Sequence, residues 1–216
     1  MEGMKHRINS GKEDMEEAEK QVEEGLDLIS EKLQKEIELY IDVCWTSQDF
    51  VVEEMGGSTG KAINPSWMQV KFNSKADNWK INLKSTTVHE YVHTWFFEKN
   101  SGRSKIMWKH IIEEALTQHF SKELVPEANH RKSTMFSREE IAEYWPQIKE
   151  KELEKKGTDF YKPLFINRSS SEYPNWLGYS LSYVIGQELL KKHTPEEFPE
   201  LGKEDIIRVG DRIFLQ

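Results

Sequence analysis

The stretch His89-Glu90-Tyr91-Val92-His93 lies inside an apolar run from Val88 to Phe97. Residues four apart share one face of a helix, so His89 and His93 can present two imidazole nitrogens to one point. Two neutral nitrogens suit Zn²⁺, which a catalytic site usually holds with three protein ligands and a water. Glu90 follows the first histidine directly, where its carboxylate can reach that water as a general base. The alternative is a pair of half-buried histidines on a core helix.

A third ligand is available about twenty residues further on, in a second helical pattern over residues 104–124 that Pro126 ends. Glu113 and Glu114 compete for this role. Glu114 shares its helix face with Met107 and Ile111, whereas Glu113 lies with Lys109, His110 and Thr117 on a face that we expect to be wetter. Helix geometry therefore favours Glu114.

The pattern resembles the gluzincin metallopeptidases, in which a helical glutamate follows H-E-x-x-H. The segment Glu114-Ala115-Leu116-Thr117-Gln118 is similar to the thermolysin-type E-A-I-S-D segment. The same glutamate with Phe120 also resembles the E-G-x-A-x-x-F segment of a smaller family of predicted zinc-dependent proteases, catalogued largely as a domain of unknown function. The register of these matches again favours Glu114, although the thermolysin-type spacing alone slightly favours Glu113.

Two further segments support that smaller family. The chain has a glycine-rich turn, Gly56-Gly57-Ser58-Thr59-Gly60, and a late segment, Trp176-Leu177-Gly178-Tyr179. The resemblance covers about residues 45–215. Metzincins are excluded, because no H-x-x-G-x-x-H continuation follows His93. The chain departs from the thermolysin-type pattern at Gln118, where that pattern has an aspartate bonded to a ligand histidine; the Gln118 carbonyl could still accept that bond.

The resemblance implies an α+β, zincin-like fold, with a small N-terminal β-sheet, an active-site helix and a mostly helical C-terminal part. It implies a zinc-dependent peptidase that acts on peptides or proteins, with His89, His93 and Glu114 as metal ligands and Glu90 as the base. A further donor should stabilise the oxyanion. Tyr179 is the first candidate for this donor, and Tyr183, one turn on, is the second; the alternative is that both are core tyrosines.

Composition limits the other classes of function. The 216 residues are 31% charged and 37% hydrophobic, and no apolar run approaches the length of a membrane span. The net charge of −8 is concentrated in the first forty residues, and the remainder is near neutral. The remainder therefore lacks the excess of positive charge that is typical of nucleic-acid binding. Cys44 is the single cysteine. It excludes an internal disulfide and, with no apolar leader at the amino end, favours a cytoplasmic protein.

Apolar residues recur every three or four positions from Met15 to Tyr40 and predict an amphipathic helix over about 13–41. Residues 1–12 are expected to be flexible. We expect residues 1–41 to form an N-terminal segment built on this helix and residues 42–216 to form the peptidase domain. The helix is expected to pack on that domain, and the alternative is a partner or dimer helix.

The other elements follow from local patterns. Residues 42–53 read as a strand, 56–60 as a turn and 67–73 as a second strand. By analogy with gluzincins, residues 67–73 are the candidate edge strand that pairs with substrate, and the alternative is an ordinary hairpin strand. Helices are expected from about 82–85 to 99, over 137–156 with a capping box at Ser137, and over 176–192. Residues 157–175 read as loop, and 195–216 as short helical pieces.

Two rival classes of function stay open. The first is a zinc hydrolase that does not cleave peptides, and the second is a binding protein with a vestigial zinc site. The sequence does not define the physiological substrate, the choice between endo- and exopeptidase action, or the oligomeric state.

Overall fold

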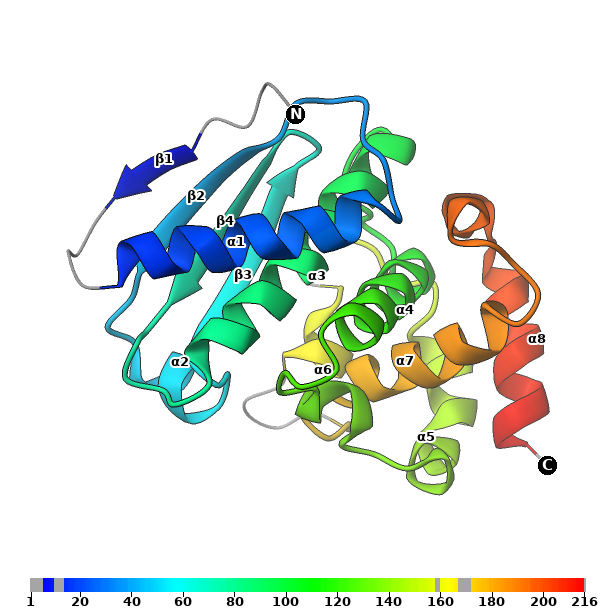
Figure 1. The fold of residues 1–216 in the computed structure, drawn as a ribbon. Coiled ribbons are helices and arrows are strands. Elements are labelled where there is room, and N and C mark those ends of the chain that lie inside the picture. Colours follow the sequence, from blue (N-terminus) through cyan, green and yellow to red (C-terminus); the bar gives the residue numbers. More distant parts are fainter. Residues whose placement is uncertain (1–5, 10–13, 158–159, 167–171, 216) are drawn as a thin grey trace. The chain divides into compact units, whose positions relative to one another are not determined.

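The computed structural model describes residues 6–9, 14–157, 160–166 and 172–215. The chain forms two compact units. The first comprises Met1–Arg103 with Phe120–Asn129, and the second comprises Ser104–His119 with His130–Gln216. The first holds the sheet and the second is helical (Figure 1). The predicted α+β class is therefore confirmed, whereas the division between residues 41 and 42 into an appended helix and a peptidase domain stays a prediction.

A four-stranded sheet organises the first unit. Its strands are β1 (His6–Asn9), β2 (Tyr40–Trp45), β3 (Ser58–Asn64) and β4 (Trp67–Phe72). Their order across the sheet is β1-β2-β4-β3. β2 runs parallel to β1 and β4, and β3 and β4 form an antiparallel pair. The strand predicted at 67–73 is present, but β4 has a neighbour on each side, so its prediction as an edge strand is wrong.

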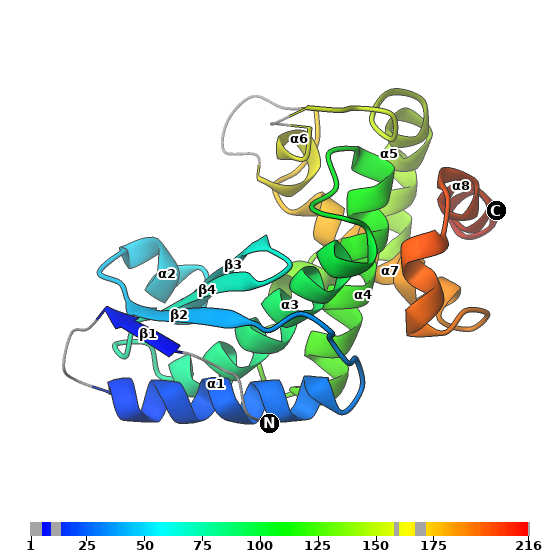
Figure 2. The same cartoon turned by 90° about the horizontal axis from the view of Figure 1, so that it is seen from above.

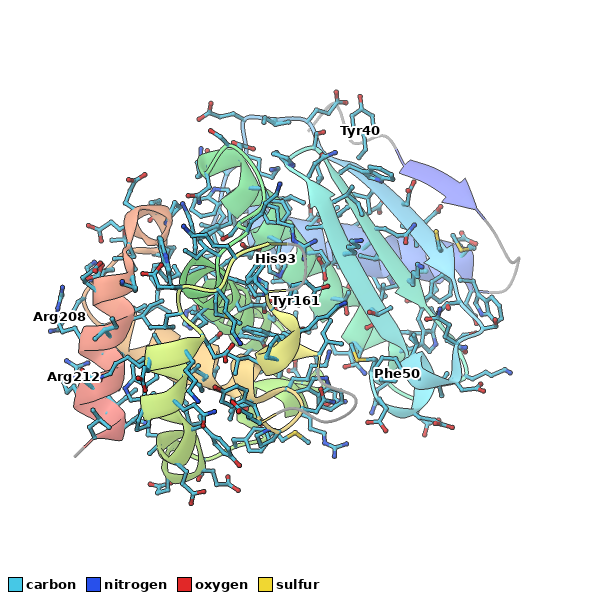
Figure 3. All side chains as sticks on the ribbon, turned by 180° about the vertical axis from the view of Figure 1, so that it is seen from behind. Tyr40, Phe50, His93, Tyr161, Arg208 and Arg212 are labelled. Atoms are coloured by element: carbon cyan, nitrogen blue, oxygen red, sulfur yellow. The ribbon has the colours of Figure 1, made fainter. Side chains whose placement is uncertain are left out.

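One face of the sheet is covered by helices α1 (Met15–Ser30) and α3 (Trp79–Lys99) (Figure 2). Alternate residues of β2 and β4 are buried on this face: Ile41, Val43, Met68, Val70 and Phe72. Their neighbours along the strands are polar or exposed, as expected for a sheet with one buried face. Figure 3 shows Tyr40 and Phe50 projecting at opposite ends of this sheet.

The amino-terminal helix is shorter than predicted. Its buried stripe runs through Ala18, Val22, Leu26 and Ile29 as the pattern requires, and the helix ends at Ser30. The apolar positions at Ile37 and Tyr40 are exposed and do not continue the stripe.

Hydrogen bonds from α3 explain this early end. The Tyr91 hydroxyl donates to the Leu33 carbonyl at 2.8 Å, and Trp95 Nε1 donates to the Gln34 carbonyl at 3.1 Å. The Glu98 carboxylate accepts the amide protons of Glu36 and Ile37. Backbone groups that would continue the helix are thus bonded to side chains of α3, a tertiary interaction that overrides local propensity.

The strand predicted over residues 42–53 is correct only as far as Trp45. Residues Asp49–Glu53 form a short helix, α2, although Val51 and Val52 favour strand by composition. The turn predicted at 56–60 extends over residues 54–57, and the rest of it begins β3, which was not predicted. The sequence of β3, Ser-Thr-Gly-Lys-Ala-Ile-Asn, has few β-branched or aromatic residues, so its signal was weak.

The second unit consists of helices. They are most of α4 (Met107–Leu124), then α5 (Arg138–Lys151), α6 (Lys162–Phe165), α7 (Leu177–Leu189) and α8 (Lys203–Phe214), with 3₁₀ turns η1 (Arg131–Thr134) and η2 (Pro195–Glu200). The capping box is confirmed: the Ser137 hydroxyl accepts the Glu140 amide proton, and the Glu140 carboxylate accepts that of Ser137. Helix α6 lies in the segment predicted to be loop.

Glycines let the helices of this unit approach closely. A Cβ on Gly186 of α7 would lie 2.9 Å from the Ala115 Cβ of α4. A Cβ on Gly178 would lie 2.7 Å from the Phe165 ring of α6. The glycine of the Trp-Leu-Gly-Tyr segment is therefore a packing requirement. Within the described parts of the chain, no helix is both long and apolar enough to span a membrane.

Candidate metal centre

Helix α3 brings the two histidines of the H-E-x-x-H stretch together. His89 Nε2 and His93 Nε2 are 3.1 Å apart, and their rings are inclined by 70°. Two nitrogens bound to one tetrahedral zinc at about 2.0–2.1 Å lie roughly 3.3 Å from each other. The two nitrogens therefore have the spacing of ligands that share one ion.

Glu114 completes the group. One ligand atom from each of His89, His93 and Glu114 lies within 4.8 Å of the other two. His93 and Glu114 are buried and His89 is half-buried. Two imidazoles and one carboxylate form a donor set found in catalytic zinc sites, where a water takes the fourth position. The chemistry and the convergence of these atoms fit zinc.

The Glu90 carboxylate lies against strand β3. Its Oε2 accepts the amide proton of Ala62 at 2.6 Å, and the side chain is 7% exposed. A Cβ on Gly60 would lie 2.4 Å from Glu90 Cγ. Glycine at residue 60 therefore makes room for Glu90, and the neighbouring backbone amide holds one of its oxygens. Gly60 is the last residue of the glycine-rich stretch at 56–60, and its contact with Glu90 requires a residue without a Cβ.

The carboxylate of Glu114 has neighbours on its own helix. Thr117 Oγ1 and Gln118 Nε2 each lie 3.3 Å from Glu114 Oε2, and His110 Nε2 lies 3.8 Å from Oε1. Gln118 does not use its carbonyl as suggested from the sequence. Its Oε1 accepts the hydroxyl proton of Ser133, while its amide group donates to Glu114.

Glu113 is not on a wetter face, and that expectation is wrong. Its side chain is 1% exposed, and His110 beside it is 6% exposed. The His110 ring packs against Phe165 at 4.7 Å and Phe160 at 5.6 Å between centroids. The covering residues come from the segment predicted to be loop, so the burial of this face was not visible in the sequence. His110 was likewise missed as a neighbour of Glu114, although a spacing of four residues would have indicated it.

Tyr179 lies at the start of α7, where it is half-buried. Its ring packs edge-on against Phe165, with 5.0 Å between centroids, and the Lys132 ammonium lies 5.0 Å from its centre. The hydroxyl of Tyr183 accepts a proton from Gln187 Nε2 at 3.2 Å. The assignment of either tyrosine as oxyanion donor stays a prediction.

Comparison with known families defines the class of this protein. A family described as "Predicted Zn-dependent protease (DUF2268)" matches residues 16–208. The chain therefore belongs to this family, as the resemblance indicated, and zinc is its cofactor. No curated protein and no solved structure matches the chain. The likeness to the zincin fold stays a prediction.

The competition between the two glutamates can be tested with matched variants. Glu114→Gln should weaken zinc binding by at least about 100-fold, more than is typical for the loss of an outer hydrogen-bond partner. Glu113→Gln should change it little, because Glu113 is outside the converging group. Competitive chelator titration measures both affinities. The reverse ranking would move the third ligand to Glu113.

Proposed function

We propose that this protein is a zinc-dependent peptidase. The observation that carries the proposal is the convergence of His89, His93 and Glu114 beside Glu90. Bound zinc would polarise the scissile carbonyl and acidify a water. The membership of a predicted protease family supports a peptide or protein as the substrate.

In the proposed reaction, Glu90 takes the proton from the attacking water and passes it to the leaving amine. The Ala62 amide, which donates to Glu90 Oε2, fixes one side of the carboxylate. The Glu90 carboxylate therefore accepts the proton in a defined orientation. Preorganisation of this kind avoids reorientation during the reaction. Tyr179 is the proposed oxyanion donor.

Strand β3 is the proposed binding edge for an extended substrate. It is the last strand in the sheet order, so β4 pairs with one of its edges only. The Ala62 amide donates to Glu90, so it is not directed at β4. Residues two apart in a strand direct their backbone groups to the same side, which gives Gly60 the same orientation as Ala62. A peptide added along this edge would run past Glu90.

The role of Glu90 is tested by Glu90→Gln. The amide keeps nearly the same volume but accepts no proton at neutral pH, so peptide hydrolysis should fall by about 10²–10⁴-fold. Zinc content should remain that of the parent protein. The measurement combines cleavage of a broad peptide library, followed by mass spectrometry, with metal analysis of the same preparation.

Cleavage at the parent rate would exclude Glu90 as the base. Cleavage by neither protein, with zinc bound in both, would favour a different zinc hydrolase or a vestigial site. Loss of zinc from the variant would assign Glu90 a structural role.

The contact with β3 is tested by Gly60→Ala. The new Cβ overlaps Glu90 Cγ, so the carboxylate must move, and hydrolysis should fall at least about 10-fold while zinc stays bound. Gly202→Ala is the control, because its Cβ would meet only ordinary contacts at 3.4 Å and beyond. Equal cleavage rates for the two variants would show that the position of Glu90 does not depend on Gly60.

A further inference from the structure

A buried chain of hydrogen bonds ends at the Glu114 carboxylate. Ser133 of η1 donates its hydroxyl proton to Gln118 Oε1. Gln118 Nε2 in turn donates to Glu114 Oε2 at 3.3 Å. The three side chains are 2%, 6% and 4% exposed, so water competes little for these bonds. Ser133 and Gln118 are fifteen positions apart in the sequence.

The Glu114 carboxylate and the Ser133 hydroxyl together set which way the Gln118 amide faces. An amide presents an acceptor oxygen on one side and two N–H donors on the other. The carboxylate only accepts, so the NH₂ group is turned towards Glu114. The Ser133 hydroxyl, which can donate or accept, gives its proton to the amide oxygen on the other side and holds the amide in this orientation. The opposite orientation would place an amide oxygen against a carboxylate oxygen, which is repulsive. A neutral side chain can thus hold an anionic one, provided that its orientation is fixed.

The position of Ser133 is itself fixed by α7. The Ser180 hydroxyl donates to the Lys132 carbonyl at 2.8 Å and accepts the Phe136 amide proton at 3.3 Å. These two bonds bracket Ser133, whose own amide donates to the His130 carbonyl at 3.0 Å. Ser180 directly follows the Trp-Leu-Gly-Tyr segment. Ser180 therefore supports, through the backbone on both sides of it, the serine that donates to Gln118.

We propose that Ser133 and Gln118 are positioning residues that orient Glu114 as the third zinc ligand. The proposal rests on the proposed function, in which Glu114 binds the metal. Donors held on Oε2, from Gln118 and from Thr117, fix the rotation of the carboxylate. A ligand whose orientation is fixed before the metal binds loses less freedom on binding. Partners of this kind around metal ligands typically contribute 10–100-fold to metal affinity.

The experiment compares Ser133→Ala, Ser133→Thr and Gln118→Met with the parent protein. The matched control is Ser182→Ala, a serine of α7 that is fully buried and whose hydroxyl has no hydrogen-bond partner among the described residues. Three properties are measured: zinc affinity by competition with a chromophoric chelator, the melting temperature of the metal-free protein, and the visible spectrum of the cobalt-substituted protein. The spectrum reports the geometry of the ligands independently of activity.

Gln118→Met should weaken zinc binding by roughly 10–100-fold and Ser133→Ala by about 10-fold, with a changed cobalt spectrum in both. Ser133→Thr, which keeps the hydroxyl, should restore affinity, and Ser182→Ala should match the parent. Parent-like affinity and spectrum in Ser133→Ala and Gln118→Met would overturn the proposal. If Ser133→Ala fails to fold, Gln118→Met alone decides between these outcomes.

The proposed function and the positioning role of Ser133 and Gln118 are overturned by different results. A parent protein that binds no zinc overturns the proposed function, and the positioning role with it. A parent protein that binds zinc through Glu114, with variants that bind equally well, overturns only the positioning role. Equal loss in Ser133→Ala and Ser182→Ala would identify a general effect of the packing around α7 and would also overturn it.

Discussion

The metal centre depends on the 3.1 Å approach of His89 Nε2 to His93 Nε2. Two imidazoles four residues apart converge only while their helix keeps its shape. Helix α3 is held by the sheet on one side, by α1, and by the segment after α1. Tyr91 contributes directly, because burial raises its pKa to about 12 and its hydroxyl keeps the proton that it donates to Leu33. Along α3, the histidines at 89 and 93 therefore alternate with Tyr91 and Trp95, whose side chains bond to the segment after α1.

The same helix also connects the metal site with the sheet. Glu90, between the two histidines, reaches the backbone of β3 through Ala62. The base and the pair of histidines thus lie within five consecutive residues of α3, and one hydrogen bond joins the base to β3. Glu114 is supported separately, by Gln118 and the η1 turn. The two histidines and Glu114 are thus held by different contacts. Their contributions to metal affinity can therefore be separated by mutation.

The parts of this account that were predictable from the sequence are those set by short-range periodicity. The spacing of His89, Glu90 and His93, the stripe of α1 and the capping box at Ser137 each depend on neighbours within one or two helical turns. The position of β4 inside the sheet was not predictable, because it depends on β2, far away in the sequence, pairing with its second edge. The end of α1 depends on Glu98, more than sixty residues away.

The errors at the site have the same origin. Analogy places the Gln118 carbonyl against a ligand histidine, but its amide is held between Glu114 and Ser133, and Ser133 lies in a turn that carries no sequence signal. The polar neighbours of Glu113 on its helix predict a wet face, but Phe160 and Phe165, from a segment whose pattern indicates loop, cover His110 on that face. In each case local pattern identified the residue, and a distant contact determined what it does.

The most direct test of the account is the zinc content of protein purified without added metal, measured by elemental analysis beside His93→Ala and His193→Ala. The account predicts about one equivalent of zinc in the parent protein and in His193→Ala, which alters a histidine outside the converging group. It predicts loss of zinc from His93→Ala. A parent protein that carries no zinc after growth in zinc-replete medium, and that takes up none on titration, would contradict it.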